Sequence, residues 1–463
     1  MNLFEKWIEP RKGRWHDHYF FTNHDLKLLL VPLIIEQMLS MMVGMADTVM
    51  ISHAGEAAVS GVSLVDMVNG VFIYVFSALA AGGGIVVSQY LGARDDRMIH
   101  KACGQVLTAC LFTGAFLMLV VSLLKKGILH MLFGQISEEV MQASLTYIRI
   151  MAISYPFLAI YHACASLFRS IGNSRLTMRI SMTANAINIT GNALSVYVLH
   201  AGVRGVALAS LVSWITASMI MMYVLMFRTK NSPLRIAFAD LLTFDGAMLK
   251  KILGIAIPNG LESGMFQVAR VTMTSIISTF GTAQIAANGV ANSLDYVNGM
   301  ISGAAMMAMP AIIGRCVGAG DYEQADYYLR KVLRIAQTLT TILCTCMILA
   351  VPYITPLYHL SPETNYYIHI LVVIHAVLTI VMGTPSGPFP SALRAVGDVR
   401  YSLYVALISL AIGRVFFSYV FALWMHYEII GMWMAMGTHW TMVFLGAYIR
   451  YRSGKWKNYR LTT

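Results

Sequence analysis

The sequence predicts an all-α polytopic membrane protein, with twelve transmembrane helices that form two parallel-repeat six-helix lobes around a central cavity. Of its 463 residues, 57% are hydrophobic and only 12% are charged, whereas a soluble domain carries roughly 25% charged residues. Twelve largely uncharged segments are long enough to cross a bilayer, which takes about 20 residues. The short alternating strands of a membrane barrel are not seen in the sequence.

The second half of the chain repeats the first. A shift of 226 positions aligns Pro32 with Pro258, Glu36 with Glu262, Gly55 with Gly281 and Trp214 with Trp440. When the shift is one residue shorter, Arg169 aligns with Arg394. Each half holds six predicted spans. Because six is even, both halves enter the membrane from the same side and are predicted to be parallel repeats.

Each predicted span is an apolar segment that ends at charged or turn residues. In order, the spans cover residues 26–51, 57–91, 98–124, 138–168, 176–199 and 203–228, and then 250–280, 284–317, 326–351, 364–392, 400–425 and 429–451. The loops Gly92–Asp95 and Gly318–Asp321 place a glycine at one helix end and an aspartate that caps the next helix. Gly82–Gly84 and Pro385–Pro390 mark expected bends in the second and tenth spans.

The domain organisation follows from these spans. The sequence divides into an N-terminal arm at the cytoplasmic membrane surface (1–25), an N-lobe (26–228), a cytoplasmic linker (229–249), a C-lobe (250–451) and a cytoplasmic tail (452–463). The linker is the expected boundary between the lobes.

The net charge of +11 reflects orientation in a membrane and not nucleic-acid binding. Most lysines and arginines between the spans fall in one alternate set of loops, and the opposite loops hold only Lys125, Lys126 and Arg204. By the positive-inside rule, both termini are therefore cytoplasmic. The six cysteines show no CxxC or Cys/His metal pattern, and we interpret them as small apolar residues.

Five short segments follow one another in the first half. They are Pro32 with Glu36-Gln37, Met45–Met50, Gly55-Glu56, Gln89–Ala93 and Leu167–Asn173. This ordered set, together with the span count and the parallel halves, resembles the bacterial multidrug and toxic compound extrusion (MATE) transporters over essentially the whole chain. The resemblance implies a twelve-helix exporter of drug-like compounds in the bacterial inner membrane, driven by inward flow of protons or sodium ions.

The resemblance also implies a coupling site. Asp47 matches the first-span aspartate that the family uses for cation coupling. Many bacterial members carry a fifth-span aspartate four residues after an asparagine, but here the pair is Asn188 and Asn192, so the acid is missing. Some members place a glutamate well into the seventh span, whereas here Glu262 lies near the start of that span and Gln267 lies farther in.

The depth of Asp47 and Asp66 supports this coupling site. Asp47 is eight residues before the external turn at Gly55, and Asp66 is eleven after it, so the two carboxylates lie at comparable depth. Such a pair would carry a proton. With Asn188 and Asn192 nearby, it would equally form an oxygen site for sodium. The alternative is a water-solvated acid near the outer end of the first span; we expect Asp47 to carry coupling.

Ionisable residues inside spans are costly and usually functional. The acids are Glu36, Asp47, Asp66, Glu262 and Asp295, and the bases are Arg149, Arg270 and Arg414. The acidic surplus of two suits a cavity that receives cations.

Several of these positions are predicted to line the substrate cavity. Under the repeat, Asp66 aligns with Asn292 and Asn69 aligns with Asp295, so each lobe carries one Asp and one Asn on the same helical face. The predicted substrate-cavity residues are Glu36, Asn69, Glu262, Gln267, Asn292 and Asp295. Because Glu36 and Glu262 each follow a proline by four residues, satisfying backbone groups freed by that proline is an equal alternative for them.

Arg270 and Asp295 are expected to form a structural ion pair. They lie eleven residues before and fourteen after Gly281, at roughly 16–21 Å of helix from that turn. An anion or proton switch is the alternative for this pair. Arg414 is expected to pair with Glu262 or a backbone carbonyl group.

These inferences point to a secondary antiporter that exports amphipathic, cationic, drug-like compounds by alternating access. The main alternative is a flippase for a lipid-linked precursor, which would need a cationic cavity. An intramembrane lipid-modifying enzyme is less favoured, because no cluster of Asp, His and Glu marks one membrane face. There is no phosphate loop for ATP, and no cofactor is expected beyond the coupling ion, H+ or Na+. The expected partners are small molecules and the lipid bilayer, not nucleic acid, and the chain is expected to act as a monomer.

Overall fold

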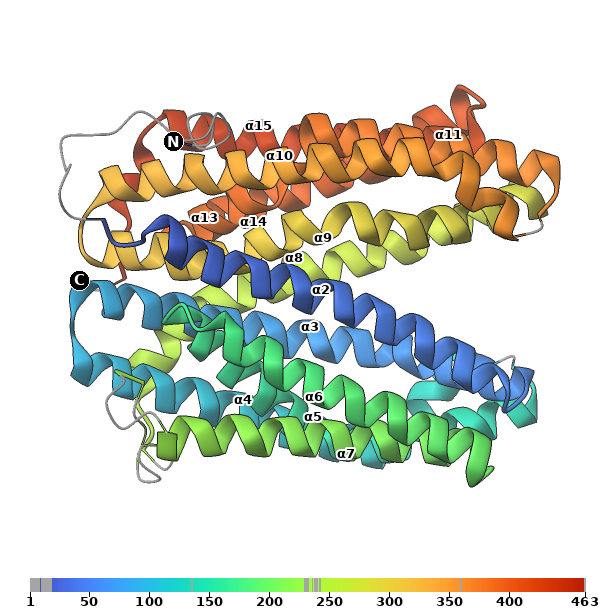
Figure 1. Ribbon diagram of the computed structural model, residues 1–463, viewed down its shortest axis with the longest axis horizontal. Helices are drawn as coiled ribbons and strands as arrows, with labels where there is room; N and C mark the ends of the chain where they lie inside the picture. Colours follow the sequence, from blue (N-terminus) through green and yellow to red (C-terminus); the bar gives the residue numbers. More distant parts are fainter. Residues whose placement is uncertain are drawn as a thin grey trace. The chain divides into compact units, whose positions relative to one another are not determined.

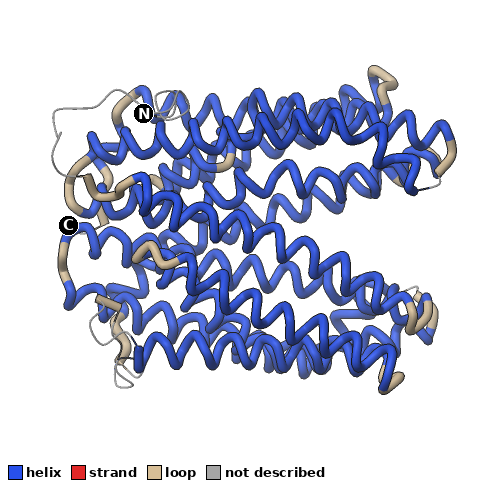
Figure 2. Tube along the Cα trace, in the orientation of Figure 1, coloured by secondary structure: helices blue, strands red, loops and turns tan. Residues whose placement is uncertain are grey.

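The computed structural model describes residues 9, 19–134, 136–228, 233–234, 236, 240, 243–358 and 360–461. Within these residues the chain is almost entirely helical and contains no strand (Figure 2). Ten of the described helices are long and apolar enough to cross a membrane. Two further helices, over residues 174–198 and 246–277, lie where the fifth and seventh spans are predicted. The predicted all-α polytopic fold class is confirmed, while most of the predicted arm and part of the linker lie outside the described residues.

The first six predicted spans form long helices (Figure 1). They are α2 (Asn23–Ser52), α3 (Glu56–Ala93), α4 (Asp96–Phe133), α5 (Glu138–Ser170), α6 (Ser174–Ala193) continued by the π-helix η1 (Leu194–Val198), and α7 (Gly202–Tyr223) continued by the π-helix η2 (Val224–Arg228).

The second half forms the same series with more interruptions. It contains α8 (Gly246–Ile277), α9 (Thr282–Gly318), α10 (Tyr322–Ile354), η4 (Thr355–Tyr358), α11 (Pro362–Leu378), η5 (Thr379–Gly383), α12 (Thr384–Ser386), α13 (Pro388–Val396), α14 (Val399–Ile408), η6 (Ser409–Phe416), η7 (Tyr419–Trp424), α15 (Glu428–Arg452) and η8 (Lys455–Asn458). The tenth span is thus broken at Gly387, between α12 and α13, inside the segment where the prolines predict a bend.

The helices form two compact units, which we call the N-unit (Lys27–Gly260) and the C-unit (Leu261–Thr463 together with the residues up to Leu26). In the N-unit, α5 is central and packs against α3, α4 and α7, while α6 packs against α7. In the C-unit, α9 packs against α10, α11 and α13, and α15 packs against η6, η7 and α11. The division falls inside α2 and α8, not in the linker that precedes α8.

The repeat inferred from the sequence is also present in the backbone. Gly55 and Gly281 precede α3 and α9 with φ values of 101° and 104°, a conformation that L side chains rarely adopt. Asp95 and Asp321 both cap the following helix, accepting hydrogen bonds from backbone N–H groups three residues later at 3.1 and 2.9 Å. The two halves therefore share turn geometry as well as sequence.

The glycines Gly82–Gly84 allow close helix packing within α3, which runs through them without a break. A Cβ atom at Gly83 would lie 2.0 Å from a methyl group of Val106 on α4. A Cβ atom at Gly84 would lie 2.2 Å from the hydroxyl group of Ser166 on α5. Neighbouring helices thus approach closer here than any larger residue permits.

Replacing Gly83 by alanine is expected to destabilise the protein. The added methyl group overlaps Val106, and overpacking of this kind costs about 1–3 kcal/mol. The matched control is Gly70→Ala in the same helix, where a Cβ atom meets nothing within 4 Å. Thermal unfolding of the detergent-purified proteins should show a lower Tm for Gly83→Ala alone, and equal Tm values would contradict this account.

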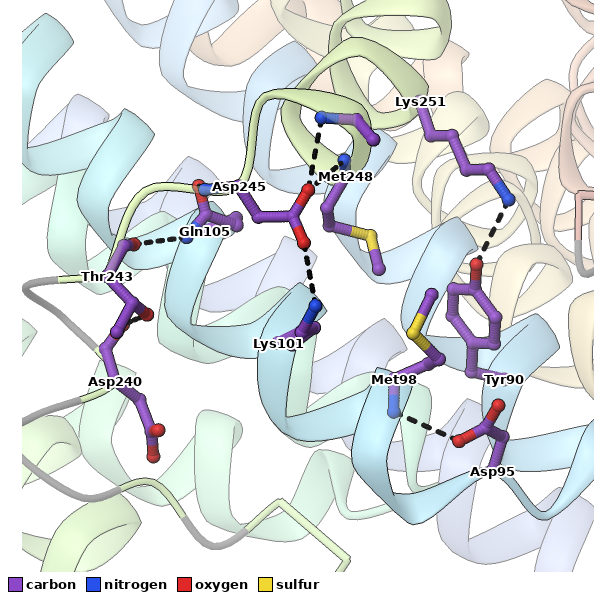
Figure 3. A network of polar contacts seen from close by, with 11 residues as sticks. Tyr90, Asp95, Met98, Lys101, Gln105, Asp240, Thr243, Asp245, Met248 and Lys251 are labelled. Atoms are coloured by element: carbon purple, nitrogen blue, oxygen red, sulfur yellow. Dashed lines mark hydrogen bonds and ion pairs between the residues drawn. The ribbon is translucent and has the colours of Figure 1, made fainter.

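The end of the linker is bound to the N-unit by a network of polar contacts (Figure 3). Asp245 accepts a hydrogen bond from the backbone N–H of Met248 at 3.0 Å and pairs with Lys101 of α4 at 2.9 Å. Gln105 of α4 donates to the carbonyl oxygen of Thr243 at 2.5 Å and accepts from the Asp245 N–H at 3.2 Å. This linker clasp (Lys101, Gln105, Thr243, Asp245) explains why the start of α8 belongs to the N-unit.

The linker clasp is expected to weaken at low pH. The hydrogen bond from Met248 N–H, and next that from Lys101, hold the pKa of Asp245 below its ordinary value of about 3.9. Because the folded pKa is the lower one, the stabilisation is complete above about pH 4 and is lost as pH falls through the folded pKa. Thermal unfolding should show Asp245→Asn less stable than wild type at about pH 7, with the difference shrinking towards about pH 3. Lys101→Gln should show the same convergence, and a constant difference would contradict the assignment.

The last residues of the arm bind to α10 of the C-unit. Phe21 donates its N–H to the Tyr328 hydroxyl at 2.9 Å, and that hydroxyl donates to the Phe21 carbonyl at 2.7 Å. Phe20 N–H donates to Gln324 at 3.1 Å, and the Arg315 guanidinium lies 5.5 Å from the centre of the Phe21 ring. The segment that leads into α2 is therefore attached to the C-unit, although α2 itself belongs to the N-unit from Lys27.

Candidate functional site

The N-unit contains a cluster of polar side chains around the carboxylate of Asp47 on α2. Asn192 of α6 donates a hydrogen bond to Asp47 Oδ1 at 2.7 Å and lies 3.2 Å from the amide of Asn188, one turn earlier. When the Asn188 amide nitrogen faces Asp47, it lies 3.0 and 3.2 Å from the two carboxylate oxygens, and its oxygen accepts from Ser210 of α7. The structure thus brings together Asp47, Asn188 and Asn192, three of the four residues that the sequence singles out for coupling.

Asp66 joins the same cluster from α3. Asn69 donates to Asp66 at 3.2 Å and accepts from the Tyr155 hydroxyl at 2.8 Å. Tyr147 of α5 is hydrogen-bonded to both Asp66 and Ser210. Since Ser210 also contacts Asn188, a chain of hydrogen bonds runs from one acid to the other.

Sequence reasoning missed Tyr147 and Ser210, the residues that connect the two acids. Tyr147 lies on α5 and Ser210 on α7, and both are buried among apolar neighbours. Serine and tyrosine are common in membrane spans, so an isolated hydroxyl group there is a weak signal. A buried polar group needs a partner, which was the only sequence indication that they contribute to a site.

The cluster offers oxygen ligands and hydrogen-bond donors but no sulfur. Asp47 is half-buried and Asp66 is exposed, and an exposed acid inside a span is tolerated on the side that water reaches. Two carboxylates and two side-chain amides can hold a proton or a hard cation that prefers oxygen ligands. In the part of the chain that the structure describes, no group of three or more His, Cys, Asp or Glu residues forms a metal site.

Glu36 and Glu262, which align in the repeat, each meet an arginine. Arg394 Nη1 lies 3.0 and 2.8 Å from the two carboxylate oxygens of Glu262. Arg169 lies 3.8 Å from Glu36, whose other oxygen accepts from Thr177 at 3.3 Å. Arg169 and Arg394 also align in the repeat, so the pairing is duplicated. The sequence repeat indicated this pairing, because the glutamate and the arginine both recur in the second half.

The predicted partner of Glu262 was wrong. Arg394, and not Arg414, occupies both of its carboxylate oxygens. Arg394 lies on α13, the helix that follows the break in the tenth span, and its side chain reaches Glu262 on α8. Arg414 lies on the π-helix η6, half-buried and within electrostatic reach of Asp295 and Arg270.

The predicted ion pair between Arg270 and Asp295 is also corrected. Asp295 Oδ1 lies 2.5 Å from Nε2 of His375 on α11. Both terminal nitrogens of Arg270 lie 3.4 Å from the Tyr296 hydroxyl. No Arg270–Asp295 pair forms among the described residues, because α9 turns Asp295 towards α11 and the adjacent Tyr296 towards α8.

The other predicted residues occupy the C-unit and α5. Asn292 donates to the carbonyl of Asn288 within α9 at 2.8 Å. Gln267 is half-buried on α8, and Arg149 is exposed on α5. The assignment of these residues to substrate contact stays a prediction.

Comparison with known proteins also finds the chain to be duplicated. A family profile described as MatE matches residues 32–194 and, a second time, residues 258–420. The two starts and the two ends differ by the same 226 residues that relate the halves of the sequence. The two matches together cover well over half of the chain.

Relatives and solved structures extend over almost the full length. The uncharacterized transporter YisQ of Bacillus subtilis is 23% identical over 434 residues, covering 92% of this chain and 93% of the relative. The probable multidrug resistance protein NorM of Thermotoga maritima is 22% identical over 443 residues, covering 95% and 94%. A solved outward-facing multidrug resistance MATE family transporter matches with a TM-score of 0.87 at 18% identity, covering 94% of this chain and 96% of that one. Taken with the duplicated helices and the profile matches, these similarities show that the chain belongs to the MatE family of multi-pass membrane transporters.

Proposed function

We propose that this transporter is a secondary antiporter that exports amphipathic, drug-like compounds across the bacterial cytoplasmic membrane in exchange for H+ or Na+. The observation that carries the proposal is the carboxylate of Asp47, which is surrounded by the amides of Asn188 and Asn192 inside the N-unit. The names of relatives, a probable multidrug resistance protein and a multidrug export protein, support the substrate class.

The coupling ion would act on the charge of the cluster. An incoming proton or sodium ion neutralises one unit of negative charge shared by Asp47 and Asp66. The hydrogen-bond chain through Tyr147 and Ser210 then has to rearrange, because a protonated or ion-bound carboxylate accepts fewer hydrogen bonds. Such a change can drive transport only if the ion binds one facing state better than the other.

The sidedness follows from the position of Asp47. Asp47 lies eight residues before Gly55, and the charge distribution places the turn at Gly55 outside the cell. The ion would therefore enter from the outer face. Substrate would enter from the cytoplasm, and ion and substrate would favour opposite facing states.

The test is export of a fluorescent amphipathic dye by the purified protein in lipid vesicles. A sodium gradient and a proton gradient are imposed separately on vesicles with wild-type protein, with Asp47→Asn as the uncoupled reference. One gradient is expected to drive uphill export by the wild-type protein only. If neither gradient drives uphill export by the wild-type protein, the antiporter proposal is refuted.

A further inference from the structure

Ion pairing changes the charge balance that the sequence suggests for the spans. The expected preference for cationic substrates rests on an acidic surplus of two. Two of the five acids, however, pair with arginines outside that count: Glu36 meets Arg169 and Glu262 meets Arg394. A third, Asp295, contacts His375, which carries a charge only when it is protonated. In the C-unit, the intramembrane arginines Arg270 and Arg414 remain, and neither is in an ion pair of the described residues.

These two arginines belong to one cluster, which three elements of the C-unit form together. Arg414 of η6 lies within electrostatic reach of both Arg270 and Asp295. Arg270 of α8 lies 3.4 Å from the hydroxyl of Tyr296, the residue next to Asp295 on α9. We call Arg270, Tyr296 and Arg414 the arginine cluster.

Asp295 offsets at most one of the two positive charges of the arginine cluster. Its Oδ1 is engaged by His375, which is buried at 3% exposure. The imidazole is fixed by the edges of Trp433 and Trp440 at centroid distances of 5.5 and 5.2 Å, and its Nδ1 lies 3.3 Å from the Thr379 hydroxyl. The charge of one carboxylate, whose Oδ1 contacts His375 of α11, is thus set against two guanidinium groups.

The guanidinium of Arg270 is placed to receive a ligand. Arg270 lies eleven residues from the Gly281 turn and is exposed, and an arginine facing lipid at that depth is costly. Its exposed side is therefore expected to face a polar space. The Tyr296 hydroxyl, 56% exposed as a residue, accepts from Arg270 and keeps its own proton to donate.

We propose that the arginine cluster binds an anionic oxygen group, a carboxylate, sulfonate or phosphate, on an amphipathic substrate. A guanidinium binds such groups with paired charge-assisted hydrogen bonds, and a second guanidinium nearby is stabilised when the anion lies between the two. The term substrate rests on the proposed export function, whereas binding itself does not require ion coupling. The same anionic group occurs on free amphiphiles and on lipid headgroups.

The test compares two probes that share an aromatic body and differ in charge, naphthalene-1-sulfonate and 1-naphthylmethylammonium. Binding to the full-length protein in phosphatidylcholine nanodiscs is measured by equilibrium dialysis. Wild type is expected to bind the sulfonate more tightly than the ammonium probe. Arg270→Gln and Arg414→Gln are each expected to raise the Kd of the sulfonate at least about tenfold, the loss of one charged hydrogen bond.

Two controls make the result specific. Arg149→Gln removes an exposed arginine from α5 in the N-unit and should leave the Kd unchanged. Arg414→Lys keeps the positive charge and should bind more tightly than Arg414→Gln. Because Arg270 is exposed, Arg270→Gln should fold even if Arg414→Gln does not. Tighter binding of the ammonium probe, or an unchanged sulfonate Kd in Arg270→Gln, overturns the proposal.

Added phosphatidylglycerol distinguishes the two sources of the anionic group. Displacement of the sulfonate by this lipid assigns the arginine cluster to a lipid headgroup, and no displacement assigns it to a free amphiphile; both outcomes support anion binding. The binding measurement is independent of coupling. If the wild-type protein shows no ion-driven export, the antiporter proposal is refuted but anion binding by the arginine cluster is not. If the sulfonate does not bind as expected, the anion proposal is refuted but the antiporter proposal is not.

Discussion

The Asp47→Asn protein is expected to lose all ion-driven uphill export while downhill movement of the same dye continues. The amide keeps the size of the side chain and its contact with Asn192, but it removes the negative charge that attracts H+ or Na+. Losing a charged partner weakens ion binding by about 1.5–3 kcal/mol, or roughly 10- to 150-fold. An ion that binds too weakly to occupy either facing state cannot shift the balance between them. Dye accumulation in vesicles, measured with and without the ion gradient, separates the two kinds of movement.

The matched control is the same chemical change at Asp245, in the linker clasp outside the spans. Asp245→Asn should show wild-type uphill export at neutral pH, and only its thermal stability should be lower than that of the wild-type protein. Asp66→Asn should reduce coupling less than Asp47→Asn, because Asp66 reaches the amides only through Tyr147 and Ser210. Wild-type uphill export by Asp47→Asn would assign coupling to another group.

Removing Arg394 is expected to cause the largest loss of stability. Arg394→Met leaves the Glu262 carboxylate without its partner inside the C-unit, and breaking a buried ion pair in this way costs about 3–5 kcal/mol. The lower end of this range applies, because the Glu262 side chain is 30% exposed and solvent screens part of the charge. Denaturation of the purified protein in detergent, followed by tryptophan fluorescence, measures the change.

A second substitution isolates the cause. In Glu262→Gln/Arg394→Met, no unpaired charge remains, so most of the lost stability should return. Arg169→Met in the N-unit should cost less, because Thr177 still donates to Glu36 and the Arg169–Glu36 distance is 3.8 Å. Equal stability of the single and double C-unit variants would show that Arg394 contributes through packing alone.

The helices were predictable because one physical requirement, an apolar segment long enough to cross a bilayer, fixes their positions. The turns before α3 and α9 were predictable from their glycines, since Gly55 and Gly281 adopt a positive φ that favours glycine. Counting from Gly55 placed Asp47 and Asp66 at one depth, and the structure brings them into one cluster. Depth along a helix is a property of sequence spacing, so this part of the candidate site could be derived.

The side-chain pairing could not be derived, because it depends on how each helix is rotated about its axis. Asp295 and Tyr296 are adjacent in the sequence, yet α9 directs one to His375 and the other to Arg270. Depth alone therefore selected the wrong partner for Asp295. Arg394 was recoverable in principle, since Glu36, Glu262 and both arginines recur together in the repeat, but recurrence alone does not show which residues are in contact.

The attachment of Phe21 to Tyr328 has a consequence for biosynthesis. The two residues are separated by 307 positions, so at roughly 5–20 residues per second the ribosome needs about 15–60 s to produce the docking partner after Phe21 emerges. Throughout that interval, α2 to α9 are produced while the Tyr328 hydroxyl that binds the Phe21 backbone does not yet exist. Phe21 thus completes its contacts only after α10 is made, and a nascent chain arrested before α10 should leave Phe21 accessible to a protease that the finished protein resists.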